Sequence, residues 1–169
     1  MRMCERCART QQTCCEKATV RLTHGDIERI GQYFPVPDFS QNADTSAWEA
    51  DTADPLFSAA FVRRDCPVVR RTSRGCFFLS DNGCVLALGV RPLICRLYPM
   101  SYCERGLEGP IAPGNGYCPP PSGPEVLAEL EMADQDQLRA WHRQLYEELR
   151  ADYRGGCDDG PRRGRPRAA

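Results

Sequence analysis

The distribution of cysteines constrains the fold of this chain more than any other feature. Eleven of its 169 residues are cysteine, and because the count is odd they cannot all pair in internal disulfides. Four cysteines fall within the first fifteen residues, and three more lie between residues 76 and 95. We interpret these two groups and one later cysteine as metal ligands that come together in the fold: Cys4, Cys7, Cys14, Cys15, Cys76, Cys84, Cys95 and Cys118.

The expected compartment favours metal binding over disulfide formation. The first residues, Met1-Arg2-Met3-Cys4-Glu5, contain no apolar region of the kind found in secretory signals. No apolar run approaches the roughly 18 residues of a membrane span. We therefore expect a cytoplasmic protein that does not associate with a membrane. Thiols stay reduced in the cytoplasm, so dense cysteines there indicate metal ligands or redox groups.

The cysteine spacing predicts an all-thiolate metal centre. Two residues separate Cys4 from Cys7, a gap that lets both thiolates reach one ion while backbone amides point at the sulfurs. Eight thiolates suffice for two four-thiolate sites, or for one cluster with the remaining thiols structural. Zinc and an iron–sulfur cluster both suit such ligands, so the expected cofactor is one of these two. Arg91 and Arg96 would either offset the negative charge of the thiolates or be solvated surface side chains.

The segment from Cys76 to Pro99 predicts a hairpin that limits how its cysteines share a metal. Asn82-Gly83 between apolar runs is a strong hairpin signal, and with these two residues in the loop Asp81 faces Cys84. Cys76 then lies on the opposite face from Cys84, whereas a three-residue loop puts both on one face about 13 Å apart. Sulfurs on a single ion lie only ~4 Å apart. Cys76 and Cys84 are therefore expected to serve different metals or one multinuclear cluster, unless the hairpin is irregular.

Hydrophobic periodicity predicts a mainly α-helical chain with a short β-hairpin, a small α+β fold that is rich in loops and stapled by metal. Thr23 and Asp26 fit a capping box at the start of the first helix, which Pro35 and Pro37 end. Residues 38–54 are interpreted as an exposed connection, and the Gly- and Pro-rich residues 106–124 as a loop. Helices are predicted over roughly 24–34, 91–97 and 124–153, strands over 20–22 and 67–72, and a short buried segment over 56–62.

The domain division separates residues 1–154, the metal-binding domain, from a disordered basic tail over 155–169. The tail contains Arg163-Gly164-Arg165-Pro166, which matches the core of an AT-hook. However, the net charge of −1 becomes −5 once the four arginines of the last eight residues are set aside. Such a body is not that of a general nucleic-acid binder, so nucleic acid is not an expected partner.

The sequence contains no recognisable catalytic motif. The two histidines, His24 and His142, are widely separated and are interpreted as surface or packing residues. A Gly-x-Ser-x-Gly motif, a phosphate loop and a dinucleotide fingerprint are all missing from the sequence. We therefore assign no catalytic residue, and the motifs favour a non-enzymatic protein while leaving an enzyme as an open alternative.

The cysteine motifs together resemble the YkgJ-type cysteine-cluster family of zinc- or iron-chelating domains. That family follows the order Cys-x2-Cys, Cys-Cys, Cys-x-Phe-Leu, Cys-x-Ile-Tyr, Arg-Pro and Cys-Arg-x-Tyr-Pro. The resemblance covers roughly residues 4–118 and is carried by Cys76-Phe77-Phe78-Leu79, Arg91-Pro92 and Cys95-Arg96-Leu97-Tyr98-Pro99. The chain departs from the family after Cys84, where Val85-Leu86-Ala87 lack its aromatic residue, and the gap from Cys7 to Cys14 is slightly long.

The resemblance implies metal binding and leaves the biological role open. The first hypothesis is a structural or metal-handling module that serves a protein partner. The alternative is an iron–sulfur redox protein, or an accessory to protein modification such as lysine methylation, since flagellin lysine N-methylases carry a similar cluster. Cys66 and Cys103 fall outside the family pattern, and whether either replaces one of the eight ligands stays open.

Overall fold

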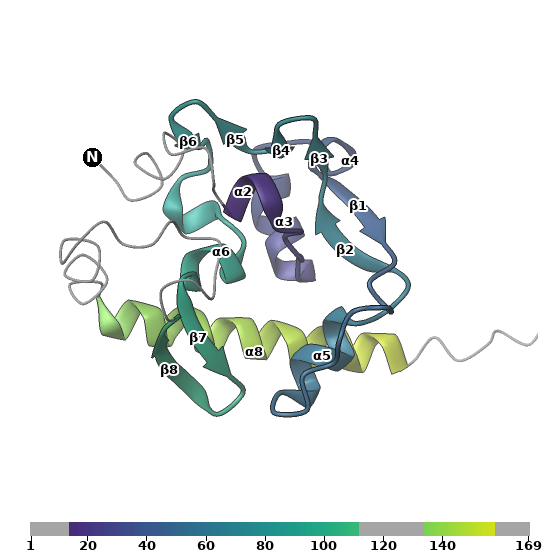
Figure 1. Cartoon of the computed structure of the whole chain (residues 1–169), viewed down its shortest axis with the longest axis vertical. Helices are drawn as coiled ribbons and strands as arrows, with labels where there is room; N and C mark the ends of the chain where they lie inside the picture. Colours follow the sequence, from purple (N-terminus) through teal and green to yellow (C-terminus); the bar gives the residue numbers. More distant parts are fainter. Residues whose placement is uncertain (1–13, 112–133, 158–169) are drawn as a thin grey trace, which may run out of the picture.

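The computed structural model describes residues 14–111 and 134–157 (Figure 1). The described helices are α2 (Cys14–Lys17), α3 (His24–Gly31), α4 (Val36–Phe39), α5 (Pro55–Phe61), α6 (Leu93–Leu97) and α8 (Gln135–Cys157), with a 3-10 helix, η1, over Leu88–Val90. The strands are β1 (Ser40–Ala43), β2 (Cys66–Val69), β3 (Arg71–Thr72), β4 (Gly75–Cys76), β5 (Leu79–Ser80), β6 (Gly83–Cys84), β7 (Met100–Cys103) and β8 (Gly106–Pro110). The fold is thus small and α+β, as predicted.

Strand pairing is more extensive than the single hairpin that the sequence predicts. The described residues contain four antiparallel pairs, which are β1–β2, β3–β4, β5–β6 and β7–β8. In the pair β1–β2, Ser40 lies opposite Val69 and Ala43 lies opposite Cys66. Residues 38–54 are therefore not simply an exposed connection, because β1 lies within them. Residues 106–110 are likewise a strand rather than the start of a loop.

The long helix α8 crosses the whole molecule and organises one hydrophobic core (Figure 1). It contacts α5 and β8 as well as α3 and α6. Its apolar residues recur every three or four positions, as the sequence predicts. The core packed against it, called the α8 core here, includes Ala60, Phe61, Cys66, Val68, Leu93, Leu97, Leu138, Leu145, Tyr146 and Leu149. The described helix begins after Asp134, whose carboxylate accepts hydrogen bonds from the amides of Asp136 and Gln137.

A second hydrophobic core lies among the short elements above α8 and contains a cysteine. This cysteine-bearing core is formed by Val20, Leu22, Ile30, Phe39, Val69, Cys76, Phe78 and Leu86. The rings of Phe34 and Phe39 pack on Phe78, with centroids 5.3 and 5.7 Å away. Ile94 of α6 packs against both cores. The helix α6 therefore joins the two halves of the packing.

Helix α3 shows how far local signals determine its limits. The predicted capping box at Thr23 and Asp26 is present, with both reciprocal hydrogen bonds made. The helix ends at Gly31, three residues earlier than predicted. Pro35 and Pro37 do not end it but start the next short helix, α4, because proline suits the first helical turn.

Two residues of the predicted connection 38–54 are buried and polar. Asp54 caps α5 by accepting a hydrogen bond from the Phe57 amide at 3.1 Å, and it also accepts one from the Tyr146 hydroxyl. Thr45 donates its hydroxyl to the carbonyl of Phe61 at 2.6 Å. These bonds hold the segment onto α5 and α8.

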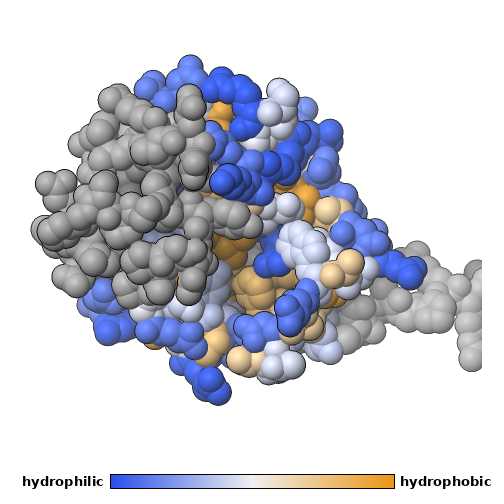
Figure 2. All heavy atoms as spheres, in the orientation of Figure 1, coloured by the Kyte–Doolittle hydropathy of each residue, from blue (hydrophilic) through white to orange (hydrophobic). Residues whose placement is uncertain are grey.

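On the face drawn in Figure 2, hydrophilic residues cover most of the described area and apolar residues appear mainly near its centre. Among the described helices, none is both long enough and apolar enough to span a bilayer.

Candidate metal centre

The fold brings four of the candidate cysteines into one cluster. Cys76 on β4 lies in the cysteine-bearing core, and partly buried thiols from three other elements pack against that core. These three are Cys15 on α2, Cys84 on β6 and Cys95 on α6. The Cys95 thiol interacts electrostatically with each of the other three. We call Cys15, Cys76, Cys84 and Cys95 the cysteine cluster.

Of the four remaining candidate ligands, one lies beside the cluster and three lie outside the described residues. Cys14 adjoins the cluster, since its side chain makes a hydrogen bond to that of Cys15. Cys4, Cys7 and Cys118 lie outside the described residues. Within residues 14–111 and 134–157, no three cysteine, histidine or carboxylate side chains form a group that could hold an ion. The described thiols are therefore neighbours without being a complete coordination shell.

Gly75 allows the N-terminal cysteine pair to lie against the later cysteine group. Its φ angle is +119°, a conformation that favours glycine. A Cβ at this position would lie 2.5 Å from the carbonyl oxygen of Cys15 and 2.7 Å from the Cα of Glu16. The bare backbone of β4 thus packs directly on α2. Arg71 of β3 reinforces this contact by donating to the carbonyls of Ala18, at 2.7 Å, and Glu16.

The hairpin that carries Cys84 has a different register from the predicted one. Leu79 pairs with Cys84 and Ser80 with Gly83, so Asp81 and Asn82 occupy the turn. The expectation that Asn82-Gly83 forms the turn is wrong by one residue. The Ser80 hydroxyl closes the observed turn by donating to the Gly83 carbonyl at 2.8 Å.

Cys76 and Cys84 lie on two successive hairpins rather than on one continuous ladder. Cys76 pairs with Arg71 in β3–β4, whereas Cys84 belongs to β5–β6. Phe77 and Phe78 form a turn between these two pairs. The segment is therefore irregular, which is one of the alternatives that the sequence analysis left open. The distance of about 13 Å, which assumes one continuous ladder, does not apply to Cys76 and Cys84.

Two arginines close the segment that joins Cys84 to Cys95. The Nε atom of Arg91 donates to the carbonyl of Leu86 at 3.0 Å. The Nε atom of Arg96 donates in turn to the carbonyl of Arg91 at 2.7 Å. Arg96 is buried, and its guanidinium lies 5.9 Å from the ring centroid of Trp141. Neither arginine is simply a solvated surface side chain, because each fixes the backbone between the two cysteines.

The cluster thiols differ strongly in acidity. A hydrogen bond from Cys14 lowers the pKa of Cys15 to about 7 against the opposing effect of burial, and the charge of Arg91 also lowers it. Burial raises the pKa of Cys76 to about 12, with further contributions from the neighbouring Cys15 and Cys84. Burial also raises the pKa of Cys95 well above its usual value. A bound cation would lower the pKa of each thiol that coordinates it, since thiols that coordinate a metal are deprotonated.

The two cysteines left open by the sequence lie elsewhere in the fold. Cys66 on β2 is fully buried in the α8 core. Cys103 ends β7, and its carbonyl oxygen lies 2.8 Å from Nε2 of the buried His142.

The two histidines have different environments. His142 packs on Tyr146, with ring centroids 4.7 Å apart, and the exposed His24 pairs with Asp152. These positions match the packing and surface roles expected of the two histidines.

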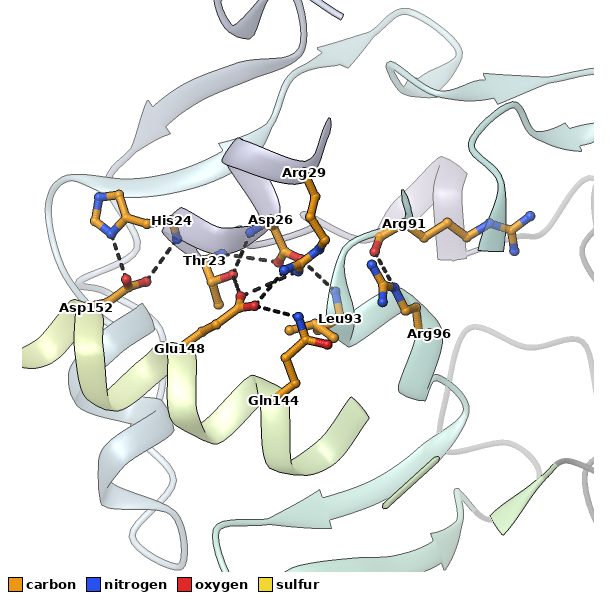
Figure 3. A network of polar contacts seen from close by, with 10 residues as sticks. All are labelled: Thr23, His24, Asp26, Arg29, Arg91, Leu93, Arg96, Gln144, Glu148 and Asp152. Carbon is orange, nitrogen blue, oxygen red and sulfur yellow. Dashed lines mark hydrogen bonds and ion pairs between the residues drawn. The ribbon is translucent and has the colours of Figure 1, made fainter. Parts of the chain in front are cut away.

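A buried carboxylate that the sequence assigns only to a helix cap also contacts the cysteine-bearing helix α6. Asp26 accepts hydrogen bonds from the amides of Thr23, at 3.2 Å, and Leu93, at 3.0 Å (Figure 3). Arg29 pairs with Asp26 and with Glu148 of α8. The contact with Leu93 spans 67 residues of sequence. No local pattern predicts it, because it depends on how α3, α6 and α8 pack together.

Comparisons with family models, curated proteins and solved structures find no match for this chain. The chemistry of the centre consequently rests on the residues themselves: buried thiols, two arginines that fix the backbone between them, and a carboxylate that holds α6.

Proposed function

We propose that the chain is a metal-binding cysteine-cluster protein that chelates zinc or an iron–sulfur cluster through its two cysteine groups. In this proposal it acts as a structural or metal-handling module in a reducing compartment such as the cytoplasm. The main supporting observation is the convergence of Cys15, Cys76, Cys84 and Cys95 from four separate elements. Cys15, Cys76 and Cys95 of the cluster carry thiols rather than disulfides.

The donor set fits such a group chemically. Thiolates are soft ligands that favour zinc and iron–sulfur clusters over hard cations such as magnesium. The cluster residues and Cys14 would supply ligands, together with Cys4, Cys7 and Cys118 from the sequence pattern. Bound zinc would cross-link α2 to the hairpins and α6, whereas an iron–sulfur cluster would supply an electron-transfer centre. Arg91 would offset part of the negative charge, since it already lowers the pKa of Cys15.

Metal content and absorption, measured on the full chain purified without oxygen, test this proposal. We expect stoichiometric zinc, or iron with matching sulfide and visible absorption. Zinc alone would favour the structural or metal-handling module. Iron with sulfide would favour the redox alternative. A folded protein that binds neither metal would contradict the proposal.

Matched serine variants identify which thiols bind the metal. Cys76→Ser and Cys95→Ser should lose most of the bound metal, because a hydroxyl is a poor ligand for these ions. Cys66→Ser is the control, since its thiol is also buried but lies in the α8 core. Equal metal content in Cys95→Ser and Cys66→Ser would contradict the assignment of Cys95.

A further inference from the structure

We infer that Asp26 is a positioning residue of the metal centre. Its buried carboxylate sets the placement of α6, and therefore of Cys95, and it makes metal affinity depend on the docking of α8. This inference rests on the proposed metal-binding function. It adds a residue and a helix that lie outside the cysteine pattern.

The first step is that α6 needs an external partner at its N-terminus. The helix has only five residues, too few to be stable by itself. The first amides of any helix have no acceptor within that helix, and the N-cap residue here, Pro92, has no polar side chain to supply one. Asp26 provides the acceptor, because its Oδ1 atom receives the Leu93 amide at 3.0 Å. Leu93 lies two residues before Cys95, so this bond fixes the turn of helix that carries the thiol.

The second step is that Asp26 itself is held by α8. Its carboxylate is fully buried and pairs with Arg29. Nη1 of Arg29 also binds Oε1 of Glu148 on α8 at 2.6 Å. Glu148 also accepts hydrogen bonds from the hydroxyl of Thr23 and from the Gln144 amide nitrogen. Figure 3 shows these side chains as one connected network that runs from α8 through α3 to α6.

A glycine makes room for the α8 carboxylate. A Cβ on Gly25 would lie 2.4 to 2.6 Å from the carboxylate atoms of Glu148. Any side chain at position 25 would therefore push Glu148 away from Thr23 and Arg29. The missing side chain at position 25 therefore leaves room for the Glu148 carboxylate to reach Thr23 and Arg29.

The third step is that α6 connects the network to the thiols. Cys95 belongs to the cysteine cluster, and the next residue, Arg96, is within electrostatic range of both Asp26 and Glu148. A shift of α6 that breaks the Leu93 bond therefore moves Cys95 relative to the other thiols. Residues that orient metal ligands in this way typically change metal affinity about 10- to 100-fold when they are mutated.

The test compares two buried carboxylates in the full chain. Asp26→Asn replaces one acceptor oxygen with an amide, so either Leu93 or Thr23 loses its hydrogen bond. Asp54→Asn is the matched control, because Asp54 is also buried and also joins a short helix to α8, through Phe57 and Tyr146. Affinity for Zn²⁺ is measured by competition with a chromophoric chelator, and the stability of each metal-free variant is measured in urea. If iron is the resident metal, the rate of its removal by a chelator replaces the zinc affinity.

We expect Asp26→Asn to lose about tenfold or more in Zn²⁺ affinity while Asp54→Asn stays close to wild type. Equal losses in the two variants would overturn the inference, since they would reflect general destabilisation. If Asp26→Asn does not fold, Gly25→Ala decides the question. Alanine favours the helix but displaces Glu148, so reduced affinity supports the inference and unchanged affinity overturns it. Failure of the wild-type chain to bind either metal would instead overturn the proposed function itself.

Discussion

At the scale of single residues, the thiols of the cysteine cluster are chemically unequal. Cys15 receives a hydrogen bond from its neighbour Cys14 and lies near the cation of Arg91, which together lower its pKa to about 7. For Cys76, burial raises the pKa to about 12, although a backbone hydrogen bond at Phe78 and the charge of Arg71 oppose this rise. Because the thiolate is the reactive form, the metal-free protein should show this difference directly.

We predict that iodoacetamide alkylates Cys15 of the metal-free protein well before Cys76 or Cys95. About half of Cys15 is thiolate at a pH equal to its pKa, so its rate should rise through neutral pH and level off above it. Cys76 should remain almost unreactive over the same range. Peptide mass spectrometry after brief labelling at several pH values measures each site separately.

Cys14→Ala provides the control for this prediction. It removes the hydrogen bond that lowers the pKa of Cys15 most, so the alkylation profile of Cys15 should move to higher pH. Bound metal should protect all coordinating thiols in the intact chain. Rapid labelling of Cys76 in the metal-free protein would contradict the described environment of the cluster.

At the scale of elements, the contact between α2 and β4 determines whether the two cysteine groups meet. We predict that Gly75→Ala weakens this contact, because alanine is strained at a φ of +119° and its Cβ would collide with the Cys15 carbonyl. The expected loss of stability is on the order of 1–3 kcal/mol, with reduced metal affinity. Urea unfolding and zinc competition measure the two effects.

Gly89→Ala is the matched control for Gly75→Ala. Gly89 lies between Cys84 and Cys95 in the sequence, but a Cβ there would meet no atom of the described structure within 4 Å. Its stability and metal affinity should stay close to wild type. Equal damage from both substitutions would show that close backbone approach is not what joins α2 to β4.

The elements that the sequence predicts well are those whose signals are contiguous. The capping box at Thr23 and Asp26 identified the start of α3, and the apolar repeat from Leu138 to Leu149 identified α8. Strand β1 was missed because Ser40-Gln41-Asn42 is polar and becomes a strand only by pairing with the buried Val68 and Val69. A local sequence pattern cannot predict such a strand, because its pairing partner is distant in sequence.

The candidate metal centre likewise has features that the sequence predicts and features that it does not. Cysteine spacing, together with the Arg91-Pro92 and Cys95-Arg96 motifs, identified the segment that supplies three of the four cluster cysteines. The register of β5–β6, the role of Gly75 and the bond from Asp26 to Leu93 were not predictable. Each depends on backbone geometry or on packing between residues that are distant in sequence.

At the scale of the whole molecule, the described residues form two hydrophobic cores of different character. The α8 core is built on a helix of 23 residues and on α5, α6 and β2. The cysteine-bearing core is surrounded by elements of two to eight residues, including α2, β4 and β6. Short elements contribute little stability by themselves, so we expect this half of the molecule to gain more stability from the proposed metal than the α8 core does.

We therefore predict that removing the metal loosens the molecule unevenly. Amide hydrogen exchange, compared between metal-bound and chelator-treated protein, should become faster in α2, β4 and β6 while α5 and α8 keep most of their protection. The Leu93 amide should lose part of its protection, because it lies where the Asp26 network meets the cluster.

Bound metal should also stabilise the folded chain as a whole. At free metal 100 times the dissociation constant, binding should stabilise the folded chain by about 2.7 kcal/mol, and this stabilisation should be absent with chelator. A uniform loss of protection would contradict the division into two cores, because it would mean that α8 and the cysteine-bearing elements open as a single cooperative unit.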